Sequence, residues 1–317
     1  MKSTFALAAT LALALASGAA LTSMASGSAL ASGAALASGN ATARADSAAL
    51  ADLDLMAAEH QHDTPAPSPA TMAEPAQPVI ASEVSFGMIY GHPVRGYLAQ
   101  LAAGPAGKVP APAAATAPGI IVIHEWWGLN DNIKAVTRRL AGEGYNALAV
   151  DLYNGKVADN PDAAKKLAGQ AMGDREGGMA ILRAADDFLK KQGAPKVGVI
   201  GWCFGGGWSL QAAIDMPKGI DAAVMYYGQP EKDHERLAKL QAPLLGFFGA
   251  DDKSIPPAAV HEMEGALKQL GKSVEVHIYD GAGHAFANPS GTAYRPAAAD
   301  DAWQRTVAFF NQKLKGA

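Results

Sequence analysis

The chain has 317 residues, of which 49% are hydrophobic and 18% are charged, a balance typical of a soluble protein that can bury a full core. Its net charge of −4 provides no basic field of the kind that binds phosphates, so we expect no nucleic-acid partner. The single cysteine, Cys203, excludes an intramolecular disulfide. That residue is therefore either apolar filler or a reactive group.

The first sixteen residues have the pattern of an export signal. Lys2 precedes an apolar run from Phe5 to Leu15, and Ala14-Leu15-Ala16 offers an A-x-A type cleavage point. The run is shorter than the roughly 20 apolar residues that a membrane-spanning helix needs. We therefore predict a signal peptide over 1–16 and a mature chain that is periplasmic or secreted, with no stable membrane span.

Residues 17–78 have the composition of a linker. They cycle first through Ala, Ser, Gly and Leu and then through repeated prolines, which cannot build a core, so we predict a disordered low-complexity segment. Within it, the run from Glu59 to Asp63 contains His60 and His62. It is either a loose metal-binding pair or, because no third ligand is placed nearby, a solvated polar tether, which is the interpretation we favour. We expect neither a metal nor another cofactor.

The rest of the chain, residues 79–317, alternates strand and helix patterns. Apolar or alternating runs predict strands at Val84–Tyr90, Val94–Leu101, Gly119–Ile123, Asn146–Val150, Lys196–Ile200, Ala222–Tyr227, Pro243–Phe248 and Val274–Tyr279. Amphipathic stretches predict helices at Asn132–Ala141, Asp162–Met172, Glu176–Lys191, Gly205–Met216, Pro257–Leu270 and Ala299–Leu314. This alternation indicates a single doubly wound α/β domain, with a mostly parallel sheet and helices on both faces. In such a fold the reactive groups lie beyond the carboxyl ends of the strands.

The strongest local signal is Gly201-Trp202-Cys203-Phe204-Gly205, between a predicted strand and a glycine-rich helix start. The spacing is that of a nucleophile elbow, a sharp strand-to-helix turn that exposes the central residue. A position at a helix N-terminus favours the thiolate and leaves the Phe204 N–H free to stabilise an oxyanion. The alternative is a buried cysteine in a glycine-rich turn.

A nucleophile of this kind needs an acid and then a histidine, each after a later strand. The loop after Pro243–Phe248 offers Asp251 and Asp252, and the loop after Val274–Tyr279 offers His284. We expect one aspartate to cap the following helix and Asp252 to orient the histidine. Among the eight histidines, only His284 has both the chain order and the loop position.

The loop that begins at His124 follows the first central strand and contains Glu125, Trp126 and Trp127. The corresponding loop of this kind of fold supplies a second oxyanion N–H, for which Trp126 is the candidate. Glu125 is then either a carboxylate at the mouth of the site that accepts the thiol proton, or a partner in an ordinary loop salt bridge.

These segments together resemble the dienelactone hydrolases. The resemblance runs from about Val84 to Leu314 through several separated motifs: His124 to Gly128, Gly144-Tyr145, Asp151-Leu152-Tyr153, Gly201 to Gly206, Tyr226-Tyr227-Gly228, Gly249 to Pro256 and Gly283 to Phe286. It implies the α/β-hydrolase fold and hydrolysis of a small-molecule ester or lactone through a thioester, with Cys203, Asp252 and His284 as the triad. It also implies that Glu125 holds the resting thiol and takes its proton when substrate arrives. We predict that Trp127, Trp202, Tyr226 and Asn288 bind the substrate.

The sequence departs from this family where a substrate carboxylate would bind. The best known members carry an arginine shortly after the histidine, whereas Asn288 is the nearest polar residue here, and only Lys165, Lys166 and Arg175 are loose candidates for a second cation. The resemblance therefore predicts the catalytic residues better than it predicts the substrate. A competing hypothesis is a secreted ligand-binding or scaffold protein with a vestigial site. Thiol redox chemistry is disfavoured because no resolving cysteine exists.

Overall fold

The computed structural model describes residues 53–63, 65–68, 74–102 and 116–316, all of which belong to one unit of the chain, Asp46–Ala317. The predicted signal peptide, 1–16, and the predicted linker as far as residue 52 lie outside the described residues. Across the described ranges, no helix has the length and apolar character needed to cross a membrane.

Eight strands of the described chain form one sheet in the order β1-β2-β4-β3-β5-β6-β7-β8. β1 and β2 form an antiparallel hairpin, β2 pairs antiparallel with β4, and the remaining pairs are parallel. The strands are β1 (Val79–Ile89), β2 (His92–Leu101), β3 (Gly119–Ile123), β4 (Asn146–Val150), β5 (Val197–Trp202), β6 (Ala222–Tyr226), β7 (Leu244–Gly249) and β8 (Val274–Tyr279).

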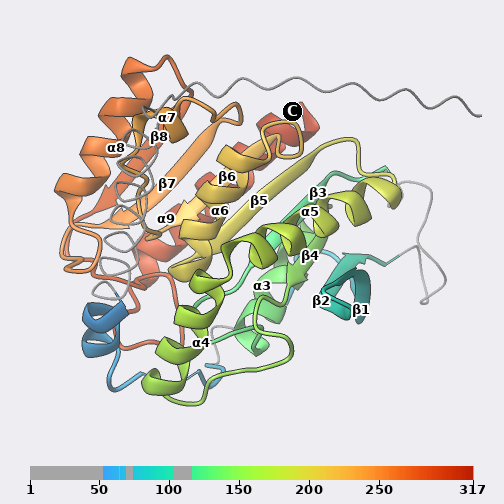
Figure 1. The fold of residues 1–317 in the computed structure, drawn as a ribbon, viewed down its shortest axis with the longest axis horizontal. Helices are drawn as coiled ribbons and strands as arrows, with labels where there is room; N and C mark the ends of the chain where they lie inside the picture. Colours follow the sequence, from blue (N-terminus) through green and yellow to red (C-terminus); the bar gives the residue numbers. More distant parts are fainter. Residues whose placement is uncertain (1–52, 64, 69–73, 103–115, 317) are drawn as a thin grey trace, which may run out of the picture. The chain divides into compact units, whose positions relative to one another are not determined.

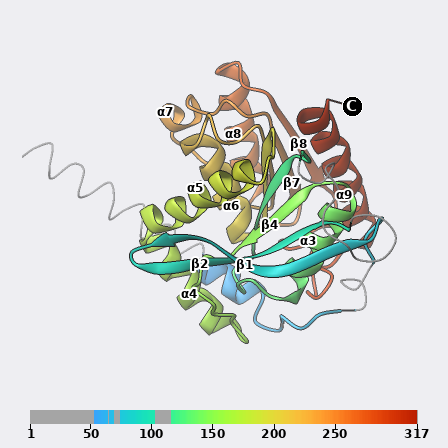
Figure 2. The same cartoon turned by 90° about the vertical axis from the view of Figure 1, so that its right-hand side faces the viewer.

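Helices cover both faces of this sheet (Figures 1 and 2): α5, α6 and α8 lie on one side, and α3 and α9 lie on the other. Every residue of β3 to β7 is buried, as expected for apolar strands packed on both faces. The helices are α3 (Asp131–Gly142), α4 (Pro161–Gly173), α5 (Arg175–Lys191), α6 (Phe204–Asp215), α7 (His234–Leu237), α8 (Pro257–Gln269) and α9 (Pro296–Phe310), followed by the π-helical turn η2 (Asn311–Lys315). The predicted doubly wound α/β architecture is confirmed.

Most element boundaries differ from the predicted ones by one to three residues, and the last predicted helix, Ala299–Leu314, is divided into α9 and the π-helical turn η2. Two other differences are larger. β1 begins at Val79 rather than Val84, because its first residues pair with the end of β2 although their side chains are largely exposed. The helix α7 was not predicted, because four residues are too few to show a helical pattern of apolar residues. Its start is stabilised by Asp233, which accepts hydrogen bonds from the N–H groups of Glu235 and Arg236.

The prediction that nothing packs before residue 79 is wrong for residues 53–63. Residues 53–59 form a helix, and Leu53 and Met56 are buried in the core. His60 and Asp63, expected in a solvated tether, are only 4% and 6% exposed. The apolar residues at i and i+3 give the segment a face that packs on the domain, which the surrounding low-complexity sequence obscures.

Candidate active site

Cys203 sits at a sharp turn between β5 and α6. Its backbone has φ 56° and ψ −119°, a conformation that costs a side-chain-bearing residue on the order of 1 to 3 kcal/mol. The flanking glycines permit the turn, because a Cβ on Gly201 would lie 2.0 Å from the Gly205 carbonyl oxygen. A Cβ on Gly205 would lie 2.4 Å from the Ile123 carbonyl oxygen. The fold therefore holds Cys203 in a strained backbone conformation directly after the carboxyl end of β5.

Two backbone N–H groups point at the Cys203 sulfur. They belong to Phe204 and Trp126, the two residues predicted as oxyanion donors, and both lower the pKa of the thiol. Burial and, next, the charge of Glu125 act more strongly in the opposite direction, so the pKa of Cys203 lies well above its ordinary value. The resting sulfur is therefore a neutral thiol at physiological pH.

His284 and Asp252 form a buried pair beside this thiol. The imidazole Nδ1 lies 2.8 Å from Asp252 Oδ2, and both side chains are almost completely buried. Asp252 Oδ1 also accepts a hydrogen bond of 2.8 Å from the Ile255 N–H, within the loop that precedes α8. The predicted helix cap by an aspartate is wrong, because α8 begins after Pro256 and has no side-chain cap hydrogen bond. Asp251, the alternative acid, is exposed.

The imidazole Nε2 of His284 is buried and has no hydrogen-bond partner among the described residues. Cys203 Sγ is not bonded to it. Instead the thiol donates to the Met56 thioether at 3.2 Å. This differs from the contact implied by family resemblance, in which Glu125 holds the resting thiol. Nε2 is thus positioned by Asp252 and free to bind a proton donor in the cavity that it shares with Cys203.

Glu125 is buried between neutral hydrogen-bond donors and has no salt bridge among the described residues. Its Oε2 accepts from Asn288 Nδ2 at 2.7 Å, and its Oε1 accepts from the Tyr227 hydroxyl at 3.4 Å. Burial raises the pKa of Glu125 to about 7. The structure therefore gives no support to a salt-bridge role within the described part of the chain, and a pKa near 7 is the value at which a proton acceptor works best near neutral pH.

His124 fixes the loop that carries Glu125 and Trp126, a role that the sequence did not suggest. Its Nε2 accepts a hydrogen bond from the Leu152 N–H at 3.2 Å, which places the ring proton on Nδ1. Nδ1 then donates to the Glu125 carbonyl oxygen at 2.6 Å. Burial lowers the pKa of His124, so the ring stays neutral and the tautomer is fixed.

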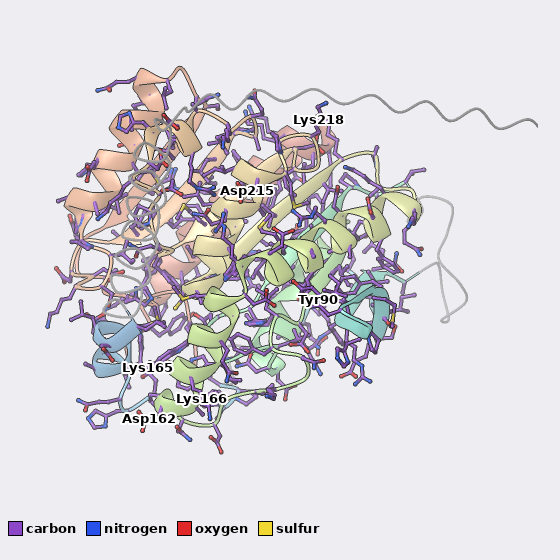
Figure 3. All side chains as sticks on the ribbon, viewed as in Figure 1. Tyr90, Asp162, Lys165, Lys166, Asp215 and Lys218 are labelled. Carbon is purple, nitrogen blue, oxygen red and sulfur yellow. The ribbon has the colours of Figure 1, made fainter. Side chains whose placement is uncertain are left out.

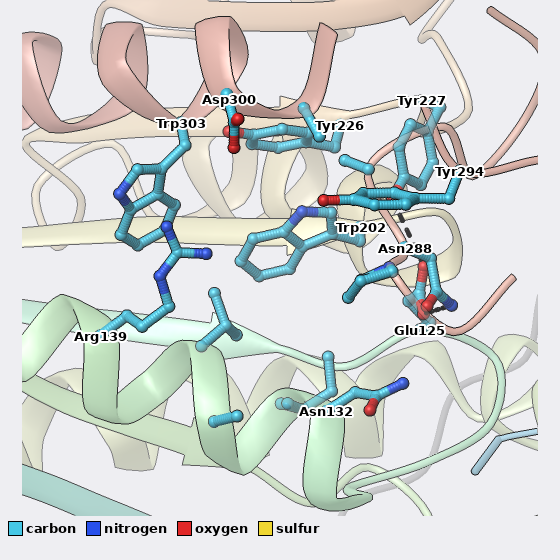
Figure 4. A pocket seen from close by; sticks show the side chains of 16 residues that line it. Glu125, Asn132, Arg139, Trp202, Tyr226, Tyr227, Asn288, Tyr294, Asp300 and Trp303 are labelled. Carbon is cyan, nitrogen blue, oxygen red and sulfur yellow. Dashed lines mark hydrogen bonds between the residues drawn. The ribbon is translucent and has the colours of Figure 1, made fainter. Parts of the chain in front are cut away.

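The predicted site residues line two different cavities. Cys203, Phe204 and His284 line a cavity of about 220 Å³ with mostly apolar walls. Three of the predicted substrate contacts line a neighbouring cavity of about 90 Å³ (Figure 4): Trp202, Tyr226 and Asn288. Glu125 also lines the second cavity, and Tyr227 lines both. Trp127, the fourth predicted contact, is buried against the Trp126 ring at 4.9 Å and lines neither cavity.

None of the three candidate cations is placed to bind a substrate carboxylate beside Cys203. Figure 3 shows Lys165 and Lys166 on α4; Lys165 pairs with Asp54 of the helix 53–59, and neither lysine lines the nucleophile's cavity. Arg175 does line it, but its Nη2 donates to Asp215 and Gln211. In the part of the chain that the structure describes, no group of three or more His, Cys, Asp or Glu side chains is placed to hold a metal ion.

A doubly wound sheet with an elbow after β5, an acid after β7 and a histidine after β8 defines an α/β-hydrolase. Solved structures of this class are similar to the chain. One is a candidate dienelactone hydrolase from Klebsiella pneumoniae, with 31% identity and a TM-score of 0.65 over 74% of this chain and 99% of that one. Another is a dienelactone hydrolase-like promiscuous phosphotriesterase from metagenomic libraries, with 25% identity and the same TM-score and coverage.

The sequence comparisons identify the family. The Dienelactone hydrolase family matches residues 106–314, and the chain belongs to that family. Protein usf of Aquifex pyrophilus is 40% identical over 205 residues, 62% of this chain and 89% of that protein. A candidate carboxymethylenebutenolidase of Saccharolobus solfataricus is 31% identical over 233 residues, 62% of this chain and 90% of that protein. The chain is thus a hydrolase of the ester- and lactone-cleaving type.

Proposed function

We propose that the protein cleaves carboxylic esters or lactones through a thioester on Cys203, with His284 as base and Asp252 as the residue that orients it. The observation that carries this proposal is the buried His284–Asp252 pair. The Nε2 of His284 has no hydrogen-bond partner among the described residues, and His284 and Cys203 line the same cavity. Phe204 and Trp126 N–H groups at the sulfur supply the two donors that a tetrahedral oxyanion needs.

The first half of the reaction forms the thioester. The Cys203 sulfur attacks the ester carbonyl carbon while Glu125, which is half ionised near pH 7, takes the thiol proton. The carbonyl oxygen becomes an oxyanion held by the two N–H groups. When the C–O bond breaks, the departing oxygen takes the proton back from Glu125, and the acyl group remains on sulfur.

The second half is hydrolysis of the thioester. His284 Nε2 removes a proton from a water molecule, whose oxygen adds to the acyl carbon. Collapse of the second oxyanion breaks the C–S bond, and the imidazolium returns its proton to the sulfur. Asp252 stabilises the charged imidazole in this step and holds the tautomer with Nδ1–H. The net change consumes one water and releases an acid and an alcohol.

The experiment is turnover of a small aryl ester and of an unsubstituted lactone by purified variants. Cys203→Ser and His284→Ala should each lower kcat/KM by orders of magnitude without changing the circular dichroism spectrum. His261→Ala, at an exposed position on α8, is the matched histidine control and should retain full turnover. Wild-type rates in either active-site variant would remove the triad assignment.

The competing hypothesis is a ligand-binding protein with a vestigial site. The two differ in stoichiometry, because a catalyst turns over many equivalents of ester per chain, whereas a vestigial site is acylated once and stops. Rapid quench and intact-mass measurement should show an acyl adduct that forms and decays in the wild type and is absent from Cys203→Ala. An acyl adduct that forms and persists in the wild type would contradict the proposal that the protein is a hydrolase.

We also propose that the protein is exported, on the strength of the signal-like sequence over 1–16. Expression in a bacterial host followed by fractionation should recover a chain shortened by about that length outside the cytoplasm. A full-length chain found in the cytoplasm would contradict export.

A further inference from the structure

The segment 53–63 lies outside the part of the chain that matches the family, which begins at residue 106, yet it is built into the active site. Asp63 Oδ1 accepts two hydrogen bonds from Thr292, one from its N–H at 2.9 Å and one from its hydroxyl at 2.7 Å. Asp63 Oδ2 lies 2.7 Å from His60 Nδ1. Upstream, the Ser254 hydroxyl donates to Glu59 at 2.6 Å. Contacts from two separate loops of the domain thus hold the segment in place.

The anchored segment forms one wall of the nucleophile's cavity. Leu53 and Met56 line the cavity together with Cys203 and His284. The His60 ring packs edge-on against the His284 ring, with centroids 5.5 Å apart, and lies 5.8 Å from the Trp126 ring. The wall therefore contacts the nucleophile, the base and the oxyanion loop together.

The Met56 side chain occupies the place that a substrate must take. Its sulfur is 3.2 Å from Cys203 Sγ, and a carbonyl carbon must come to about 3 to 3.5 Å from the attacking atom before reaction. The two cannot be present at once. A methionine side chain has three rotatable bonds and can swing within a cavity while its helix stays anchored. The acyl group that reacts is thus one that fits into the space Met56 vacates.

The charges around this space favour an uncharged acyl group. The negative charges of Glu125 and Asp252 both raise the pKa of the Cys203 thiol, so the surroundings of the sulfur are negative. Arg175 is the one cation among the described residues that line the cavity, and it is bound to Asp215. An acyl chain that ends in a carboxylate would enter this region without a free cation to pair with.

We infer that Met56 is the specificity-determining residue of this active site, and that the wall formed by the segment 53–63 selects compact, uncharged, apolar acyl groups. This inference rests on the proposed hydrolase function. It assigns a substrate class to the nucleophile's cavity and a role to a segment that lies outside residues 106–314, the range that matches the family.

The test compares 4-nitrophenyl acetate, hexanoate and a glutarate monoester in the wild type, Met56→Ala and Leu55→Ala. Leu55 is on the same helix but is 51% exposed and does not line the cavity, so it is the matched control. Each methylene buried in the freed space favours binding about fourfold. Met56→Ala should therefore raise the hexanoate-to-acetate ratio of kcat/KM about tenfold or more. Leu55→Ala and Met56→Leu, which keeps the bulk, should leave it unchanged, and the glutarate ester should be the poorest substrate of the wild type.

Alkylation of the single cysteine gives a readout that does not depend on ester hydrolysis. Iodoacetamide should modify Cys203 several-fold faster in Met56→Ala than in Leu55→Ala, as followed by intact mass. The wild type should prefer iodoacetamide over iodoacetate more strongly than free cysteine does. If no ester is turned over, the hydrolase proposal fails, but the alkylation rates still show whether the Met56 side chain blocks access to Cys203. An unchanged acyl preference, or equal alkylation rates in the two alanine variants, overturns the inference.

Discussion

Replacement of Glu125 by glutamine should stabilise the folded protein at neutral and higher pH. The carboxyl is 5% exposed, and its side-chain hydrogen bonds come from two neutral donors, Asn288 and Tyr227. Burial raises its pKa from 4.5 to about 7. A shift of that size corresponds to about 3 kcal/mol of preference for the protonated form in the folded state.

The sign follows from proton linkage. Because folding raises the pKa of Glu125, the folded chain holds this proton more tightly than the unfolded chain. The stability it contributes is complete below pH 4.5 and is lost as the pH rises through about 7. Glutamine cannot ionise, so the difference in unfolding free energy between Glu125→Gln and the wild type should grow by about 3 kcal/mol from pH 4 to pH 8.

Urea unfolding followed by tryptophan fluorescence at a series of pH values measures this difference directly, and groups that titrate alike in both proteins cancel. A difference that stays constant within about 0.5 kcal/mol across that range would refute the view that Glu125 is held in a nearly neutral, desolvated site. The same variant should lose most of its ester turnover at pH 7, because glutamine cannot take the thiol proton.

Asp252→Asn should lower kcat by about two to four orders of magnitude while unfolding at the wild-type urea concentration, because asparagine can keep the hydrogen bond from the Ile255 N–H but favours the wrong tautomer of His284. Equal kcat values would remove the orienting role. Gly205→Ala should lower the thermal midpoint by several degrees, since its Cβ would meet the Ile123 carbonyl oxygen at 2.4 Å. Gly265→Ala on α8, where a Cβ meets nothing within 4 Å, is the control and should hold or raise the midpoint. Indistinguishable midpoints would show that the elbow tolerates a side chain.

The sequence was sufficient to place the chemistry at one edge of the sheet. Buried parallel strands leave continuous apolar runs such as Gly119–Ile123, and the carboxyl ends of such strands meet, so residues that follow them come together. This is why the pairing of His284 with Asp252 could be predicted across 32 residues of chain. Both residues were chosen by chain order, which the topology translates into proximity.

The surroundings of the thiol could not be predicted in the same way. Met56 and Asp63 lie in a stretch whose short helical pattern is obscured by low-complexity sequence, and their positions depend on tertiary contacts with Cys203 and Thr292. Such contacts join residues 147 and 229 positions apart and leave no local pattern. The same limit applies to Tyr227. Its own backbone has a positive φ of 37°, and its hydroxyl donates to Glu125 from 102 residues away in the sequence.

Burial is the main cause of the raised pKa of Glu125, and the neutral donor Asn288 lowers that pKa slightly, so a change at position 288 should move the pH dependence of the reaction. Asn288→Arg would place a guanidinium near the carboxylate, with room toward the adjoining cavity of about 90 Å³. An opposite charge at such a distance lowers a carboxyl pKa by about one to three units. If Glu125 takes the thiol proton, the acid limb of the kcat/KM profile should lie near pH 7 in the wild type and move down by that amount in the variant.

Asn288→Leu provides the opposite perturbation, because it removes the N–H donor at 2.7 Å without adding charge and leaves the carboxylate less well solvated. Its acid limb should move above pH 7. Arginine and leucine are both larger than asparagine, so a purely structural disturbance by added bulk would shift both profiles in one direction or neither. Opposite shifts require a titrating carboxyl at position 125, and acid limbs that coincide in all three proteins would assign the proton acceptor to another group.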